Sequence, residues 1–201
     1  MKKLNLLILL LISTIGFAQK MSVVKGDFKF LLGQKDVNVE FHYSNLQLLK
    51  ENLTESQYVE NRKKELNEKN RGVGDTWEKK WKGAKEAIWQ PKFLELIAAT
   101  LTKEKDIVFQ EGLATAKYTL IVDVVWIYPG WDVAMMKQPA KVSVNLKIVE
   151  TNNRNNVLVE VTSVHAPGDQ WGSNFSNESR IGEGFAKTGK SFGKMIIKDL
   201  K

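Results

Sequence analysis

Two stretches in the second half of the chain carry the residue pattern of β-strands, and they constrain the fold more than any other feature. Residues 117–128 are apolar at most positions of both alternating faces, which is typical of a strand inside a sheet. Residues 141–150 alternate between apolar and polar side chains, which indicates a strand with one face in water. Residues 157–164 return as its partner after an asparagine-rich turn at 151–156. The sequence therefore predicts a sheet built around this hairpin.

Two further strands are predicted nearer the N-terminus, at residues 28–32 and 37–43. Strict alternation along 117–128 also predicts which side chains share one face of that strand: Tyr118, Leu120, Val122, Val124 and Trp126.

Helical spacing accounts for most of the remaining chain. Thr54 and Gln57 form a capping-box pattern at the start of a helix over about residues 55–70. A second helical pattern begins at Asp75, and Pro91 either kinks it or starts another helix. The last helix, near 178–200, carries four glycines, which indicate either close backbone packing against the sheet or a loosely held helix.

The order of these elements predicts an α+β fold, with a mixed or antiparallel sheet of four to five strands and helices packed mainly on one face. Residues 20–201 are long enough for one domain with its own core.

The first nineteen residues have the three parts of a secretory signal peptide: a basic start, a short apolar run and a small-residue exit. The apolar run is shorter than the roughly 20 residues that span a bilayer, so cleavage after Ala18 and no transmembrane segment in the mature chain are expected. The chain contains no cysteine, which excludes disulfides, thiolate nucleophiles and a lipoprotein anchor. We therefore expect a periplasmic or extracellular protein that is not lipid-anchored.

The charge balance of the mature chain is mildly basic. Removing Lys2 and Lys3 from the 30 basic residues leaves 28 against 23 acidic ones, a net charge of +5. This excess is typical of simple solubility, and it also suits acidic partners such as lipid headgroups or anionic glycans.

Side chains that could carry catalysis are few. His42, Asp123 and His165 fall in no spaced metal or nucleophile motif. We therefore expect no catalytic residues, no metal and no cofactor. The alternative is a small envelope hydrolase or metal-dependent enzyme that uses these three residues.

Residues 77–85 mix tryptophans with lysines, a pattern found where proteins meet nucleic acid or membranes. Trp77 and Trp81 also fit one buried helix face with the lysines in water. We favour this second interpretation and expect no nucleic-acid partner, while adhesion of this basic helix to anionic lipid stays open.

The best candidate site lies at one end of the predicted sheet. Strand 157–164 is expected to run antiparallel to strand 141–150 and to end beside its start. The loop after residue 128, which leads into that start, should therefore lie close to the segment that begins at residue 165. Both segments carry Pro-Gly, a tryptophan and an aspartate, which suits recognition of a peptide or sugar; the alternative is that the tryptophans cap the core. The candidate binding residues are Tyr128, Trp131, Asp132, His165, Asp169 and Trp171.

Three segments carry a family resemblance: residues 118–124, the 141–164 hairpin, and residues 180–190 running into 194–198. They resemble uncharacterised secreted proteins of Bacteroidetes type. More distantly they are similar to the small α/β envelope domains of the penicillin-binding-protein activator lipoproteins, the curli-secretion lipoprotein and the amino-terminal domain of TolB. The resemblance covers roughly the last 90 residues and the first strand. It implies a non-catalytic envelope domain that binds another envelope protein or a cell-wall component, and it supplies no active-site residues.

Overall fold

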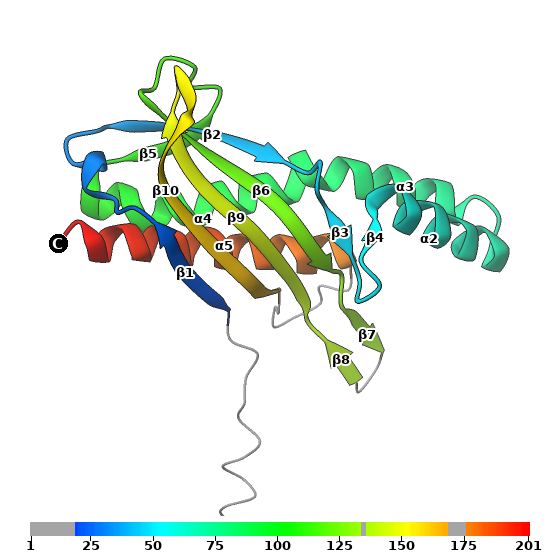
Figure 1. The fold of residues 1–201 in the computed structure, drawn as a ribbon. Helices are drawn as coiled ribbons and strands as arrows, with labels where there is room; N and C mark the ends of the chain where they lie inside the picture. Colours follow the sequence, from blue (N-terminus) through cyan, green and yellow to red (C-terminus); the bar gives the residue numbers. More distant parts are fainter. Residues whose placement is uncertain (1–18, 134–135, 169–175) are drawn as a thin grey trace, which may run out of the picture.

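A twisted mixed sheet forms the centre of the fold in the computed structural model, which describes residues 19–133, 136–168 and 176–201 (Figure 1). Within these residues the sheet has eight strands in the order β1-β10-β9-β6-β2-β5, with the short pair β3 and β4 attached beside β6. Strand β2 runs parallel to β5 and β6, whereas β6, β9, β10 and β1 are antiparallel neighbours. The strands are β1 (Lys20–Lys25), β2 (Asp36–His42), β3 (Gln47–Leu48), β4 (Leu53–Thr54), β5 (Val108–Glu111), β6 (Tyr118–Tyr128), β9 (Ala140–Glu150) and β10 (Asn153–Gly168).

The structure confirms a mixed α/β architecture with a mixed sheet, but the expected four to five strands are too few. The additional strands are short or polar and give no periodic signal: β3 and β4 have two residues each, and β1 exposes five of its six residues. The predicted strand at 28–32 is also wrong. Its central residues form a 3₁₀ turn, η1 (Lys29–Leu31), because Phe28 and Leu31 are both buried and lie three residues apart.

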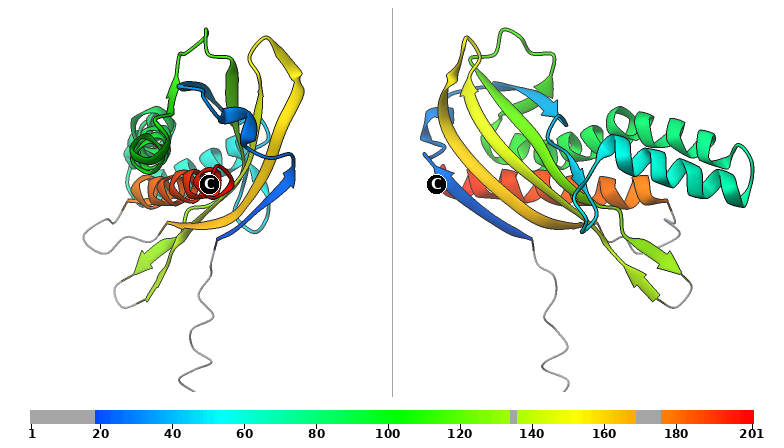
Figure 2. Two further views of the ribbon diagram at one scale, coloured as in Figure 1. Left: turned by 90° about the vertical axis from the view of Figure 1, so that its left-hand side faces the viewer. Right: turned by 45° about the vertical axis from the view of Figure 1, so that its right-hand side comes forward.

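Helices α4 and α5 lie on the same side of the sheet, as the left view of Figure 2 shows. Helix α2 begins with the predicted capping box, in which Thr54 and Gln57 satisfy each other's backbone N–H groups. A π-helical turn separates α3 from α4, with Pro91 in the first turn of α4. The helical segments are α2 (Glu55–Lys69), α3 (Val73–Ala84), the π turn η2 (Lys85–Trp89), α4 (Gln90–Lys105) and α5 (Asn177–Asp199).

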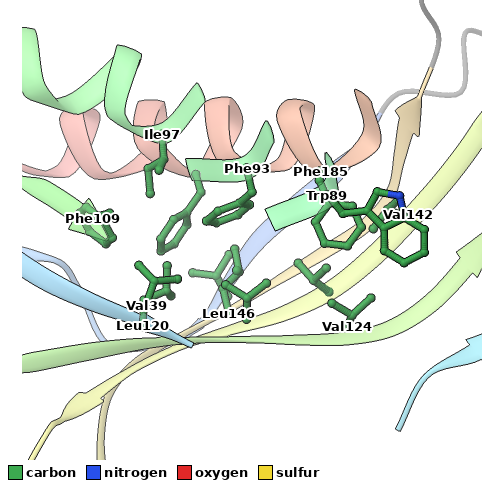
Figure 3. Packing of buried hydrophobic residues seen from close by; sticks show 14 of the residues in the cluster. Val39, Trp89, Phe93, Ile97, Phe109, Leu120, Val124, Val142, Leu146 and Phe185 are labelled. Carbon is green, nitrogen blue, oxygen red and sulfur yellow. The ribbon is translucent and has the colours of Figure 1, made fainter. Parts of the chain in front are cut away.

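The core fills the space between the sheet and this helical layer (Figure 3). Trp89, Phe93 and Phe185 come from the helical layer and pack over Val142 and Leu146 of the sheet, and all five residues are 0% exposed. Burying aromatic side chains of this size supplies much of the hydrophobic free energy of folding.

The glycines of α5 allow close packing, as one of the two sequence interpretations predicted, but chiefly against α4. A Cβ added at Gly189 would lie 2.3 Å from the backbone carbonyl oxygen of Phe93, so two helix backbones nearly touch there. Gly184 meets the sheet, with an added Cβ 2.6 Å from Val142 Cγ2. The tight glycine contacts therefore join helix to helix as well as helix to sheet.

A β-bulge changes the face on which Trp126 lies. The pairing of β6 with β9 shifts register between Val124 and Trp126, and Ile127 rather than Trp126 is fully buried beyond that point. The prediction that Trp126 shares the face of Val124 is therefore wrong, because one extra residue in a strand reverses the alternation that follows it.

A bidentate ion pair ties the tip of the β9–β10 hairpin to β2. Both Arg154 terminal nitrogens donate to the Glu40 carboxylate, at 2.9 and 2.8 Å. The hydrogen bond from Arg154 is the largest influence on the pKa of Glu40 and holds it below its ordinary value, although partial burial opposes the shift.

Replacing Arg154 should therefore show a defined pH dependence. Glu40 has a folded-state pKa below its unfolded value, so its contribution to stability is present above the unfolded pKa and is lost as pH falls through the folded pKa. We expect Arg154→Gln to raise the pKa of Glu40, measured by NMR, and to lower the unfolding free energy at neutral pH but not at about pH 3. The exposed Arg71 provides a control, and an Arg71→Gln variant that lost the same stability would contradict this assignment.

In the described part of the chain, no helix has the length and apolar character needed to cross a membrane. The predicted signal peptide falls almost wholly on residues 1–18, which lie outside the described residues, so it stays a prediction.

Candidate functional site

A groove with a volume of about 560 Å³ lies where the sheet end, α2 and the first turn of α5 meet. Three of the six predicted site residues, Tyr128, Trp131 and Asp132, line it. The other lining residues are Leu49, Leu53, Tyr58, Asn61, Arg62, Glu65, Pro129, Gly130, Val133, Asn177 and Arg180.

One wall of the groove is the base of a small hairpin, β7 (Trp131–Val133) and β8 (Met136–Gln138), which projects from the end of the main sheet (Figure 1). Gly130 starts the hairpin with φ +69°, and an added Cβ there would lie 2.5 Å from the Gln138 carbonyl oxygen. Only glycine fits this combination of left-handed backbone and close approach. The turn at Gly130 therefore sets the direction in which the hairpin leaves the sheet.

Apolar side chains of this hairpin remain in contact with solvent. Trp131 is 39% exposed, Val133 61% and Met136 65%, and none of them belongs to the core cluster. Large apolar groups left exposed together on one projecting element are typical of an interaction surface. The exposure of Trp131 counts against the interpretation that it caps the core.

The second wall comes from one face of α2, where Tyr58, Asn61, Arg62 and Glu65 recur at helical spacing. Arg62 donates to the Glu65 carboxylate at 2.7 Å. Tyr58 is buried against Trp77 and Trp81, and burial raises its pKa to about 12. The phenol is therefore neutral at physiological pH and serves as a hydrogen-bonding group.

The first turn of α5 closes the groove with Asn177 and Arg180. Arg180 is 7% exposed and its guanidinium donates to the Asn177 side-chain oxygen. The groove thus combines aromatic rings, two guanidinium groups and the carboxylates of Glu65 and Asp132. Such a surface can recognise a partner that offers both apolar and polar groups.

His165 lies on β10 and does not line the groove. Its φ is +56°, and its backbone N–H donates to Ser143 Oγ at 3.1 Å. The His165 ring is 4.9 Å from Trp126, which stacks on Tyr128 with ring centres 6.3 Å apart. Burial, followed by the charge of Lys141, lowers the pKa of His165. These rings form an aromatic row, His165–Trp126–Tyr128, that reaches the edge of the groove. The predicted meeting of the loop after residue 128 with the whole segment from residue 165 stays a prediction, because that segment lies partly outside the described residues.

The predicted site residues Asp169 and Trp171 lie outside the described residues, so their place in the site stays a prediction.

The three residues that a hydrolase or metal-dependent enzyme would use, according to the alternative interpretation of the sequence, are spread over three strands. His42 on β2 pairs in register with Asp123 on β6 and lies 3.7 Å from the Glu40 carboxylate, whereas His165 packs against Trp126. Across residues 19–133, 136–168 and 176–201, no group of three histidines and carboxylates is placed to hold a metal ion. No observation in the described chain favours catalysis by this set.

The basic and aromatic segment at 77–85 is mainly structural. Trp81 is fully buried and its indole N–H donates to Glu55 at 2.9 Å. Lys82 pairs with Glu78 at 2.6 Å and Lys85 pairs with Glu55 at 2.7 Å. The interpretation that a tryptophan faces the core while lysines face outward is confirmed for Trp81.

Sequence reasoning missed the walls that the helices supply. Tyr58 and Arg62 are four residues apart and Asn177 and Arg180 are three apart, spacings that place each pair on one helix face. Nothing in these spacings shows that the two faces meet the same loop, because that depends on how α2 and α5 pack at the end of the sheet.

No protein-family model matches the sequence, and no curated protein matches it. Among solved structures, the chain is similar to the PelC dodecamer from Paraburkholderia phytofirmans in space group P6, with a TM-score of 0.38 and 12% identity over 91% of this chain and 96% of that chain. A point variant of that dodecamer in space group C2 gives a TM-score of 0.36 with the same identity and coverage. Likeness at this level carries no argument about function, and the resemblance to the envelope lipoprotein domains stays a prediction.

Proposed function

We propose that this chain is a non-catalytic, exported envelope protein with a binding or assembly role, and that its partner docks in the groove beside the β7–β8 hairpin. The partner is another envelope protein or a component of the cell wall. The observation that carries the proposal is the exposed Trp131 at a groove that also contains tyrosine and arginine side chains. Tryptophan, tyrosine and arginine are the residue types that contribute most often to the energetic centres of protein interfaces.

The hairpin extends this surface beyond the groove. Val133 and Met136 pair across the hairpin and are both more than 60% exposed. A partner that covered them would remove apolar area from water, which favours association. The guanidinium groups of the groove would then provide orientation through hydrogen bonds.

Removal of the hairpin-side aromatic rings tests the proposal. We expect the double variant Tyr128→Ala/Trp131→Ala to bind its partner at least about 30-fold more weakly, because truncating a residue at the energetic centre of an interface costs about 2 kcal/mol or more. The measurement is affinity capture from the native envelope, with bound proteins and glycans quantified separately to distinguish the two partner classes.

The matched control removes exposed apolar side chains elsewhere. Val24 and Leu32 are each 61% exposed and lie outside the groove, so Val24→Ala/Leu32→Ala should capture the same partner as the unmodified protein. If both double variants lose capture equally, or if neither does, the groove is not the docking site.

A further inference from the structure

The solvent-facing side of α5 is almost entirely lysine beyond its first two turns. Between Phe185 and Asp199 the exposed residues are Lys187, Lys190, Lys194, Lys198 and Asp199. The first four, here called the lysine stripe, recur at intervals of three or four residues and therefore form one line along the helix. At 1.5 Å per residue the stripe is about 17 Å long. Figure 1 shows α5 along one side of the fold, with β1 beside its C-terminal half.

In the described chain, no lysine of the stripe forms an ion pair, and the two acids of α5 nearest to it are already engaged. Glu183 pairs with Lys92 at 3.1 Å. Asp199 accepts the backbone N–H of Phe28 at 2.8 Å. Asp199 keeps its negative charge beside Lys198, so the four lysines of the stripe and Asp199 together leave an excess of positive charge along this side of α5.

Neighbouring elements extend the positive surface. Lys103 of α4 and Lys201 join Lys194 and Lys198 around a depression of about 450 Å³ between the two helices, where Glu104 is the only acidic side chain among the described lining residues. On the side of α5 that meets β1, the Ser191 hydroxyl donates to the side-chain oxygen of Gln19, the residue just before β1.

Strand β1 itself carries an exposed aliphatic residue, Val23. Val23 alternates in β1 with Met21, which packs against the core, so both point to the helix side of the sheet. Val23 remains 46% exposed.

The chemistry of the stripe favours an array of anions over a single anionic ligand. Lysine is a hydrated point charge without the planar fork by which arginine grips one phosphate or carboxylate. Single-stranded nucleic acid is typically bound through exposed aromatic rings on which its bases stack, but Phe185 and Phe192 of α5 are fully buried. A straight line of unpaired ammonium groups instead matches the repeating charges of a bilayer surface.

We propose that the lysine stripe binds the anionic headgroups of a lipid bilayer, with α5 lying along the membrane surface. The basic segment at 77–85 is less suited to this role, because two of its four lysines, Lys82 and Lys85, are held in ion pairs with Glu78 and Glu55.

Co-sedimentation with lipid vesicles tests this assignment. The protein should partition onto vesicles of equal parts phosphatidylglycerol and phosphatidylcholine at low salt, and not onto phosphatidylcholine alone. The variant Lys190→Gln/Lys194→Gln/Lys198→Gln should lower partitioning on the order of 100-fold, about fivefold for each lysine. Glutamine and lysine have similar helix propensities, so circular dichroism should show unchanged folding.

A second triple variant separates the stripe from net charge. Lys64, Lys79 and Lys80 are exposed on α2 and α3 and form no ion pair within the described chain. Their replacement by glutamine removes the same charge but should change partitioning by no more than about twofold, because charges beyond the screening length contribute little. Equal losses in the two variants would overturn the assignment. So would vesicle binding that persists in about 1 M salt, or binding to heparin without binding to the vesicles.

Discussion

Replacement of Trp89 by alanine should cost about 3 to 5 kcal/mol of unfolding free energy, the range for deleting a fully buried large aromatic side chain. Trp89 is 0% exposed and lies between the helical segments and the sheet. Its ring stacks on Phe185 with centroids 5.8 Å apart and meets Trp81 edge-on at 5.2 Å. The variant therefore leaves a cavity bordered by three elements. Denaturant unfolding monitored by circular dichroism measures the loss.

The indole N–H of Trp89 makes a smaller contribution to the unfolding free energy, which a second variant measures separately. It donates to the Glu178 carbonyl at 2.9 Å, which ties the π turn to the first turn of α5. Trp89→Phe keeps most of the packing but loses this bond, so its cost should be clearly smaller than that of Trp89→Ala. If Trp89→Ala lost less than about 2 kcal/mol, the proposed position of Trp89 at the centre of the core would be contradicted.

Gly189→Ala should destabilise the protein by about 1 to 3 kcal/mol, although alanine is the better helix former. The added Cβ would lie 2.3 Å from the Phe93 carbonyl oxygen, an atom fixed in the backbone of α4. Either α4 or α5 must move to relieve the overlap, and both are packed against the core. The result should appear as a lower denaturation midpoint with an unchanged denaturant slope.

Gly83 is the matched control for this prediction. It lies in α3, and an added Cβ there meets nothing within 4 Å. Gly83→Ala should therefore raise stability by about 0.5 to 1 kcal/mol through helix propensity alone. We therefore expect Gly189→Ala to lower the unfolding free energy and Gly83→Ala to raise it. Stabilisation by both substitutions would show that α4 and α5 do not pack as closely as described.

The long, regular elements could be predicted from the sequence. The hairpin of β9 and β10, strand β6 and helix α5 each carry a clear periodic pattern over much of their length. Such a pattern indicates the element and its buried face as far as the first bulge or register shift. Short elements such as β3 and the β7–β8 hairpin carry too few residues for periodicity. Their conformation follows instead from the elements that they contact.

Local irregularities explain the wrong assignments. In the helical segments, the buried positions Ala84 and Trp89 are five residues apart, because the π turn inserts one residue into the usual spacing. Strict helical spacing from Trp77, Trp81 and Ala84 predicts Ile88 as the next buried position, whereas Trp89 is fully buried and Ile88 only partly buried. The bulge near Trp126 reversed the face of a strand in the same way.

Some residues of the candidate site could be identified from the sequence and others could not. Tyr128, Trp131 and Asp132 were identified because Pro-Gly and aromatic residues follow a well-defined strand, whereas Arg62 and Arg180 belong to helices whose placement the sequence does not specify. The groove contains the first turn of α5, and the lysine stripe occupies the later turns of the same helix. One helix thus joins the two proposed contact surfaces.

Photo-crosslinking from position 131 tests the central claim, that the groove and its exposed tryptophan form a docking site. A photoreactive phenylalanine analogue replaces Trp131 in one sample and the exposed Lys64 in another, and both proteins are irradiated in the native envelope. We expect a discrete cross-linked product from position 131 that is absent from position 64. The same products from both positions, or none from position 131 in a folded protein, would contradict it.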